Sequence, residues 1–208
     1  MVVRTRARPM SPEERRSAIL DAAIPLLREN GREVSTKQLA EAAGVAEGTL
    51  FRAFGDKDAI IGAAIERYFD PEPFRNALRG IDPDEQTVDK IRQVLHLLSE
   101  RFTGVIGFMS AVRGDVGPPP RRGTGEAEWI GILSQLFRPD ELGIPVETLG
   151  FYLRLLAFGA AIPPITSVHA FTLDELLELV TRGVLPVATS DASDAPETAV
   201  PSAARKKD

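Results

Sequence analysis

The chain has 208 residues, 43% of them hydrophobic, so it can form one large or two small domains with a sizeable core. The absence of cysteine excludes disulfide bonds and thiolate metal sites, and no apolar run reaches the roughly 18 residues of a transmembrane helix. The net charge of −5 argues mildly against nucleic-acid binding by the whole chain, but residues 1–57 carry 10 Lys and Arg against 8 Asp and Glu, whereas the remainder carries 15 against 22.

The chain begins with a short basic segment that we expect to be a flexible arm. Arg4, Arg6 and Arg8 stand on alternate residues, and no apolar segment of a signal peptide follows them, so we expect a cytoplasmic protein. Two interpretations of the arm remain open. It contacts DNA phosphates or the minor groove, or it is a disordered terminus with ordinary charge.

A first helix is predicted over residues 11–30. Ser11, Pro12 and Glu14 form a typical helix start, with a capping serine, a proline in the first turn and an acid three residues after the cap. Apolar residues then recur at helical spacing, and Gly31 ends the helix.

Residues 35–57 predict two short helices joined by a tight turn. Ser35 and Gln38 form a second capping-box pattern, and Gly44 supplies the positive φ at which a helix can end. Another helical segment, residues 46–54, follows. This arrangement is typical of a helix-turn-helix, whose second helix enters the major groove, although the bare pattern also occurs in helical hairpins that bind no DNA.

The segment TKQLAEAAGVAEGTLFRAFGDKDAII resembles the DNA-binding signature of the TetR family of transcriptional regulators. The resemblance covers about the first third of the chain, and the remainder matches the family only in length and helical character. It implies an all-α fold of about nine helices, with an N-terminal three-helix helix-turn-helix domain and a C-terminal helical domain for ligand binding and dimerisation.

The resemblance also implies which residues contact double-stranded DNA. Phosphate contacts are expected at the N-terminus of the first motif helix, where free N–H groups, hydroxyls and a cation form an anion site, and at the lysine that follows the second. The residues concerned are Ser35, Thr36, Lys37 and Lys57. The leading residues of the recognition helix, expected at base edges, are Ala46, Glu47, Gly48 and Thr49. Glu47 either accepts a hydrogen bond from cytosine N4 or faces solvent.

Two residues of the recognition helix depart from the family pattern. Members usually carry Tyr and His around the positions of Phe51 and Ala53, and both reach phosphate through polar groups that this chain lacks. Arg52 is the candidate to compensate, and we include Phe51 and Arg52 among the DNA-contacting residues. The departures affect phosphate anchoring and not the fold.

A further helix over residues 58–69 is apolar enough to pack on both the DNA-binding part and the rest of the chain. Two prolines follow it, and we place the domain boundary near them. The predicted regions are an arm and helix-turn-helix domain (1–57), a connecting helix (58–70), an effector-binding and dimerisation domain (71–185) and a disordered tail (186–208).

The central part of the chain predicts helices over residues 82–102, 103–113 and 126–137, with a loop at 114–125. Eight residues of the second domain are candidates for contacting a small-molecule effector, with plain core or structural packing as the alternative for each. They are His96, Phe102, Phe108, Met109, Trp129, Tyr152, Arg154 and Phe158.

The last two predicted helices indicate a homodimer. The first, residues 146–162, is apolar nearly all round, with only Glu147 and Arg154 charged, so we expect it to be buried on all sides. The second, residues 172–184, carries one apolar stripe. Pairing of both with their copies across a two-fold axis would form a four-helix bundle.

The leading hypothesis is a dimeric repressor that binds a palindromic operator and is released by a small, mainly apolar effector. The alternative is a helical dimeric scaffold without specific DNA binding. No P-loop, dinucleotide-binding, Gly-x-Ser-x-Gly or His-Glu-x-x-His pattern occurs, so we predict no enzyme, no catalytic residues and no cofactor. The two histidines are far apart in sequence and support no metal site, and we expect no membrane partner.

Overall fold

The computed structural model describes residues 10–112, 125–162 and 169–184 of the chain. Three predicted features lie outside the described residues: the arm with Arg4 and Arg6, most of the loop at 114–125, and the tail at 186–208. Every regular element of the described part is helical, which confirms the predicted all-α fold. The elements are α1 (Pro12–Asn30), η1 (Gly31–Glu33), α2 (Thr36–Ala43), α3 (Glu47–Phe54), α4 (Lys57–Phe69), α5 (Glu72–Arg79), α6 (Thr87–Ala111), α7 (Gly125–Leu136), η2 (Pro139–Glu141), α8 (Val146–Ala161) and α10 (Leu173–Val184).

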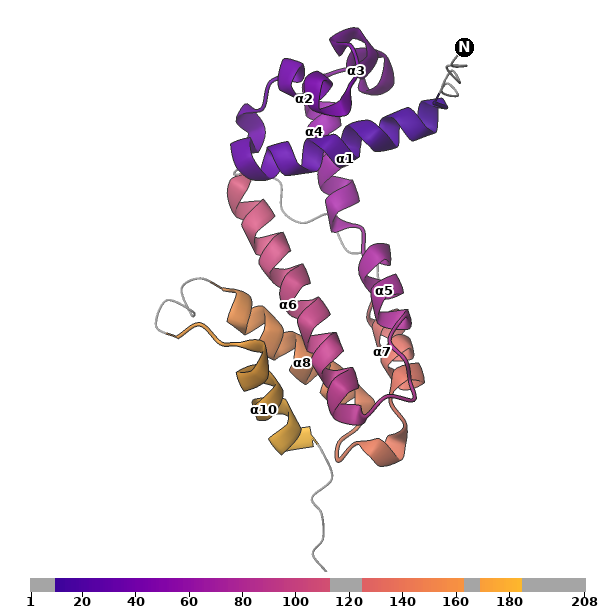
Figure 1. Cartoon of the computed structure of the whole chain (residues 1–208), viewed down its shortest axis with the longest axis vertical. Helices are drawn as coiled ribbons and strands as arrows, with labels where there is room; N and C mark the ends of the chain where they lie inside the picture. Colours follow the sequence, from indigo (N-terminus) through magenta and orange to yellow (C-terminus); the bar gives the residue numbers. More distant parts are fainter. Residues whose placement is uncertain (1–9, 113–124, 163–168, 185–208) are drawn as a thin grey trace, which may run out of the picture.

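The helices are arranged as a head, made of α1 to α4, and a body, made of α5, α6, α7, α8 and α10 (Figure 1). Each has its own hydrophobic core, because short amphipathic helices bury their apolar faces only against one another. In the head, α1 packs against α2, α3 and α4. Its predicted start is confirmed: the Glu14 N–H donates to the Ser11 hydroxyl at 3.1 Å, and the Ser11 N–H donates to the Glu14 carboxylate at 2.6 Å.

Helix α6 corrects the sequence prediction for the centre of the chain. The sequence predicts two helices, over residues 82–102 and 103–113, but the structure has a single helix of 25 residues. Gly104 does not interrupt it. A Cβ at Gly104 would lie 2.7 Å from the Tyr68 hydroxyl oxygen, so the glycine allows α4 and α6 to approach closely.

Two helix starts also differ from the prediction. The expected start at Asp82 is wrong, because its carboxylate accepts a hydrogen bond from the Asp84 N–H at 2.9 Å in a turn, and α6 begins only at Thr87. The prolines after α4 end that helix, but they also open α5, which the sequence analysis missed. Pro73 lies in the first turn of α5, where its missing N–H costs no helical hydrogen bond.

The C-terminal half of α6 fastens the head to the body. Phe108 and Val112 are buried in the core of the head, where the Phe108 ring stacks on Tyr68 with ring centroids 4.2 Å apart. Arg101 donates to three carbonyl groups at the end of α4, those of Tyr68, Phe69 and Asp70, at 3.0, 3.0 and 3.2 Å. A cation from α6 therefore satisfies carbonyls that the end of α4 leaves without helical partners.

Helix α8 is buried on one face only. Leu149, Leu153 and Ala157, spaced four residues apart, are buried in the body. Three large apolar side chains on another face are open to solvent: Phe151, Leu155 and Phe158, which are 68%, 55% and 44% exposed. The single chain therefore leaves open one face of α8, as expected if that face meets a second subunit, and burial on all sides stays a prediction for the dimer.

Lys90, in the first turn of α6, is the charged side chain that the described residues bury completely. Its ammonium group donates to the Glu141 carboxylate at 2.6 Å and to the Leu136 and Pro83 carbonyls at 3.0 Å each, which occupies all three N–H groups. The Phe137 ring centroid lies 5.2 Å from Nζ. A buried charge is tolerated only when it is paired and hydrogen-bonded. Since Leu136 and Glu141 lie in the corner between α7 and α8, these bonds hold that corner against α6.

We expect Lys90→Met to lower the free energy of unfolding by about 3 kcal/mol, because it leaves the Glu141 carboxylate and two carbonyls without their shared donor. Burial raises the pKa of Glu141, but hydrogen bonds from Lys90 and the Arg138 backbone outweigh it and hold the pKa below its ordinary value of 4.5. The stabilisation is thus complete above pH 4.5 and is lost as the pH falls through the lowered pKa, so the difference between the two proteins shrinks in acid. Urea denaturation at several pH values measures this difference in the free energy of unfolding.

Arg92→Met is the matched control on the same helix. Arg92 pairs with Asp174 at an exposed position, so its loss should cost less than about 0.5 kcal/mol. Equal losses in the two variants, or a Lys90→Met loss that persists unchanged in acid, would contradict the assigned role of the buried pair.

Candidate nucleic-acid interface

Helices α2 and α3 form the predicted helix-turn-helix. Helix α2 ends at Gly44, whose φ of 65° lies in the left-handed region that favours glycine. The Val45 N–H donates back to the Ala40 carbonyl at 3.0 Å, and α3 begins after Ala46, which is extended. Ala40 of α2 and Leu50 of α3 are buried in the head, so each helix turns one face to the core and presents another to solvent.

The N-terminus of α2 has the geometry of an anion site. The Ser35 N–H donates to the Gln38 side-chain oxygen at 2.8 Å and the Gln38 N–H donates to the Ser35 hydroxyl at 3.2 Å, which confirms the predicted capping box. Thr36 and Lys37 occupy the first turn, where backbone N–H groups have no intrahelical acceptor, and Lys37 is exposed. Free N–H groups, a positive helix end and a cation together favour a phosphate.

A hydrogen bond links the N-termini of the two helices. The Thr36 hydroxyl donates to the Glu47 carboxylate at 3.3 Å. Glu47 remains exposed, so its carboxylate keeps acceptor positions for a base or for water, and both interpretations of this residue stay predictions.

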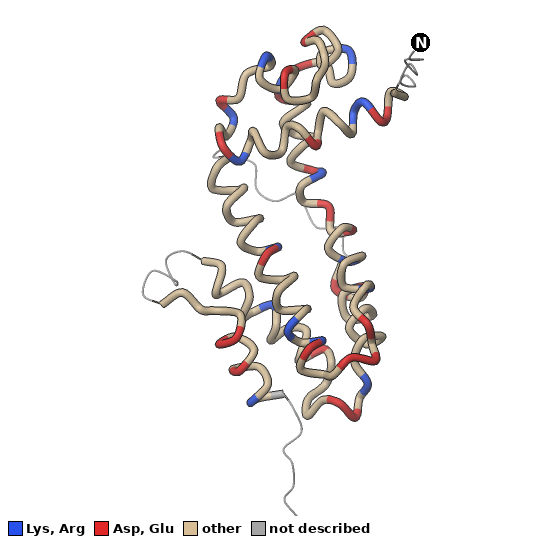
Figure 2. The backbone as a smooth tube through the Cα atoms, in the orientation of Figure 1, with Lys and Arg blue, Asp and Glu red and all other residues tan. Residues whose placement is uncertain are grey.

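The outer face of α3 gathers the residues predicted to read DNA. Ala46, Glu47, Gly48, Phe51 and Arg52 are exposed, and Thr49 is partly exposed. The Phe51 ring is a large apolar group with 44% of its surface open. Lys57, the first residue of α4, is partly buried and follows Asp56, whose carboxylate caps α4 by accepting from the Ala59 N–H at 2.8 Å. Figure 2 shows Lys and Arg at this free end of the head, interspersed with Asp and Glu.

Arg16 on α1 positions α3 and is a residue that the sequence analysis missed. Its guanidinium donates to the Ala53 carbonyl and lies 4.0 Å from the centroid of the Phe54 ring. Both contacts hold the C-terminal end of α3 on α1. The partners are 37 residues apart in sequence, so no local pattern indicates the contact.

The eight candidate effector contacts do not surround one cavity. Phe108 lies in the core of the head, away from the body residues. Phe102 packs edge-on against Phe158, with ring centroids 5.4 Å apart. The Arg154 guanidinium lies 4.4 Å from the centroid of the Trp129 ring and also pairs with Glu126, so this cation already has two partners.

The remaining candidates are equally dispersed. Met109 and Tyr152 are partly buried, and His96 is exposed at the edge of a small hollow of about 140 Å³ between α6, α8 and α10. Among the residues that the structure describes, no group of three or more His, Asp or Glu side chains is placed to hold a metal ion. None of the described helices is long and apolar enough to cross a membrane.

Comparison with known proteins gives the head a clear counterpart. The family described as "Bacterial regulatory proteins, tetR family" matches residues 19–64. The HTH-type transcriptional repressor KstR of Mycolicibacterium smegmatis is 35% identical over 156 residues, which are 69% of this chain and 72% of KstR. The nucleoid occlusion factor SlmA of Vibrio campbellii is 32% identical over 101 residues, which are 46% of this chain and only 51% of SlmA.

The fold of most of the chain also has solved counterparts. A TetR transcriptional regulator from Streptomyces coelicolor superposes with a TM-score of 0.54 at 22% identity. The superposition covers 83% of this chain and 99% of that regulator. At this identity the likeness supports the arrangement of a helix-turn-helix head on a helical body, and it carries no argument about ligand or target.

We expect Ser35→Ala to lower the free energy of unfolding by about 1 kcal/mol, because it removes the acceptor for the Gln38 N–H at the start of α2. Ser11→Ala is the matched control, since Ser11 forms the same reciprocal capping box at α1. Thermal denaturation measures how much free energy of unfolding each variant loses. A Ser35→Ala protein as stable as the wild type would show that the α2 cap does not hold the motif together.

Proposed function

Because the chain belongs to the TetR family of transcriptional regulators, we propose that it is a dimeric repressor that binds a palindromic DNA site and leaves it when a small, mainly apolar effector binds. DNA-binding regulation of transcription follows from the family. The dimer, the palindrome and the release by an effector are the proposal. The observation that carries it is the exposed outer face of α3 beside the open N-terminus of α2.

In this proposal α3 lies in the major groove and the first turn of α2 meets the phosphate backbone. The leading residues of α3 approach base edges: Ala46, Glu47, Gly48 and Thr49. Phosphate contacts come from Ser35, Thr36, Lys37 and Lys57. The capping box and the Arg16 contacts support this arrangement, because they fix the orientation of both helices before DNA is present.

Phe51 and Ala53 provide no polar group for phosphate, so other residues of this chain have to supply the contact. Arg52 is exposed and has no ion-pair partner among the described residues, which suits it to a phosphate. Arg4 and Arg6 of the proposed arm would add contacts to phosphate or in the minor groove.

The named relatives support repression unequally. KstR is named as a transcriptional repressor, and the match spans most of both proteins. SlmA is named as a nucleoid occlusion factor, and the match spans about half of each. The longer match therefore favours a repressor.

A two-fold dimer through α8 and α10 would bury the apolar surface that the single chain leaves open. Phe151, Leu155 and Phe158 of α8 are exposed, and so is Leu179 of α10. Contiguous exposed apolar side chains of this kind are typical of an interface. A two-fold dimer carries two copies of α3, which is why we propose a palindrome with half-sites about 34 Å apart.

Release by an effector is proposed to be a shift between two conformations of the dimer. The effector favours a state whose two α3 helices no longer fit successive major grooves, and DNA in turn opposes effector binding. Helix α4 is suited to carry this change, because it lies in the core of the head and Arg101 of α6 holds its C-terminal end.

A helical dimeric scaffold without specific DNA binding remains the second candidate. The observation that favours it is the apolar Phe51 where the family usually has a polar phosphate contact.

We retain the proposed division into an arm and helix-turn-helix domain (1–57), a connecting helix (58–70), an effector-binding and dimerisation domain (71–185) and a tail (186–208).

The first test is binding of the full chain to DNA flanking its own coding region, measured by fluorescence anisotropy at several salt concentrations. We expect a discrete site and a steep fall of affinity with salt. Lys57→Ala should weaken binding to all sequences and reduce the slope of log K against log salt by about 1. Thr49→Ala should instead reduce discrimination against random DNA, by about fivefold.

Arg79→Ala is the charge-matched control, because Arg79 lies on α5 in the body and pairs with Glu72 and Glu128. It should leave affinity and salt slope unchanged. A stable dimer that binds every sequence equally, or that binds with no salt dependence, would instead favour the scaffold.

The dimer is tested by placing a charge on the exposed face of α8. Leu155→Glu should convert the dimer to monomer in sedimentation velocity, because it would bury two unpaired carboxylates in an apolar interface. Phe51→Glu is the control, since it makes the same kind of change at an exposed apolar residue of the head. It should leave the dimer intact but abolish DNA binding. A Leu155→Glu protein that stays dimeric would exclude this face as the interface.

A further inference from the structure

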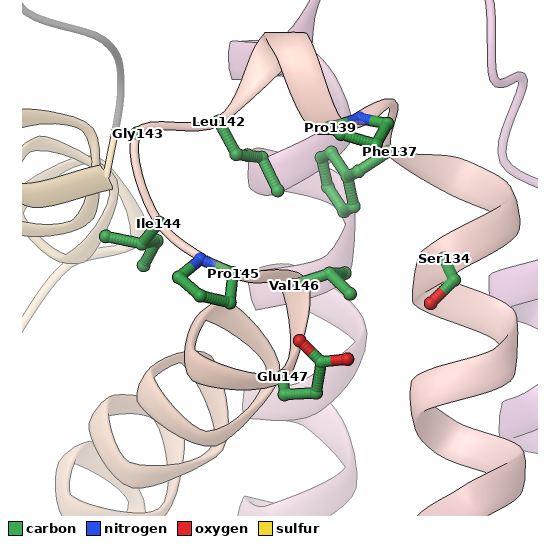
Figure 3. Close-up of a pocket in the computed structure, with 9 residues that line it drawn as sticks. All are labelled: Ser134, Phe137, Pro139, Leu142, Gly143, Ile144, Pro145, Val146 and Glu147. Carbon is green, nitrogen blue, oxygen red and sulfur yellow. The ribbon is translucent and has the colours of Figure 1, made fainter.

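A hollow lies at the end of the body away from the head, between the end of α7, η2 and the first turn of α8 (Figures 1 and 3). Its volume is about 460 Å³, within the roughly 300 to 1,000 Å³ of small-molecule sites. Phe137, Leu142, Ile144 and Val146 give it an apolar lining. None of the eight residues predicted to contact an effector borders it.

Two polar side chains face this apolar lining from opposite helices. Figure 3 shows the Glu147 carboxylate on the α8 side and the Ser134 hydroxyl on the α7 side. The Ser134 hydroxyl donates to the Ile130 carbonyl at 2.9 Å, so its oxygen can still accept a hydrogen bond. Glu147 is exposed and forms no ion pair with any residue that the structure describes.

Among the residues that line the hollow, Glu147 is the one with a charged side chain. Glu141 pairs with Lys90 at 2.6 Å and with Arg138 at 2.7 Å. The hollow therefore combines a lining that favours apolar groups with one carboxylate that lacks a counter-charge. A cation is attracted to such a site and an anion is repelled.

We propose that this hollow binds a small organic cation, with its charged group against Glu147 and its apolar body against Phe137, Leu142, Ile144 and Val146. Quaternary and alkylated amines belong to this class. The ammonium makes its ion pair at the open edge of the hollow, and the apolar part leaves water. Burial of the apolar part supplies most of the affinity, and Glu147 supplies the preference for positive charge.

The hollow is also connected to the head by rigid structure. Lys90 of α6 holds the Leu136 carbonyl and the Glu141 carboxylate on either side of Phe137. Helix α6 continues from there without a break to Phe108, which is buried in the core of the head. If the proposed repressor function is correct, a ligand in the hollow is thus placed to act as the effector. Binding itself does not depend on that function.

The test uses the full chain without DNA and a series of three probes with one alkyl chain: hexyltrimethylammonium, 1-hexanol and hexyl sulfate. Calorimetry should give the cation the highest affinity, the alcohol a lower one and the sulfate the lowest. Glu147→Gln should lower the affinity for the cation by about fivefold and leave the affinity for 1-hexanol unchanged, as expected for the loss of one partly screened ion pair. Glu66→Gln, an exposed acid on α4, is the matched control and should change nothing.

A second variant tests the location without altering charge. Ser134→Phe places a ring into the hollow from an exposed position on α7 and should weaken all three probes, while circular dichroism confirms that the helices remain. Equal affinity for the three probes, no effect of Glu147→Gln, or undiminished binding by Ser134→Phe would each overturn the proposal. DNA binding measured on the same preparation separates the two claims. A protein that binds its operator but not the cation refutes only the proposed cation site. A protein that binds the cation but no operator refutes only the proposed repressor function.

Discussion

Helix α6 belongs to two hydrophobic cores at once, and it packs against α1 of the head and against α5, α8 and α10 of the body. Its first half packs in the body with Ile91, Val94 and Leu95, and its last turns bury Phe108 and Val112 in the head. A helix of 25 residues is about 37 Å long, so one rigid element spans the distance between the two cores. Neither core is complete without it, so α6 links the head to the body.

Two cations on α6 fix its neighbours by the same chemistry. Lys90 near one end and Arg101 towards the other both donate to main-chain carbonyls of other helices or loops. A carbonyl at the end of a helix or in a corner has no partner within its own element, and a fixed N–H donor satisfies it. The Lys90 contacts hold the α7–α8 corner, and the Arg101 contacts hold the end of α4. Through α6, the two sets of contacts connect the α7–α8 corner of the body to α4 of the head.

This arrangement gives the proposed regulation a physical basis. The head presents an exposed α3 whose position is set by α1 through Arg16, and α4 joins that head to the end of α6. An effector changes DNA affinity only by the difference between its affinities for the two conformations, so it must bind where the structure transmits a change. Among the aromatic residues of the body, Phe102 packs against Phe158 and Phe74 packs against Trp129. The open hollow beside α8 has free volume and lies on the α6 network.

Local sequence determined the head: capping boxes at Ser11 and Ser35 and the left-handed Gly44 encode helix ends through contacts within a few residues. The all-α class and the family follow from the same segments. Tertiary structure decided the rest. Gly104 lies inside a continuous α6 where the Tyr68 hydroxyl leaves no room for a Cβ, and Lys90 is buried because Glu141, 51 residues away, pairs with it. Which aromatic rings of the body contact an effector stays a prediction, because a ring that fills the core and a ring that lines a hollow have the same sequence pattern until their neighbours are known.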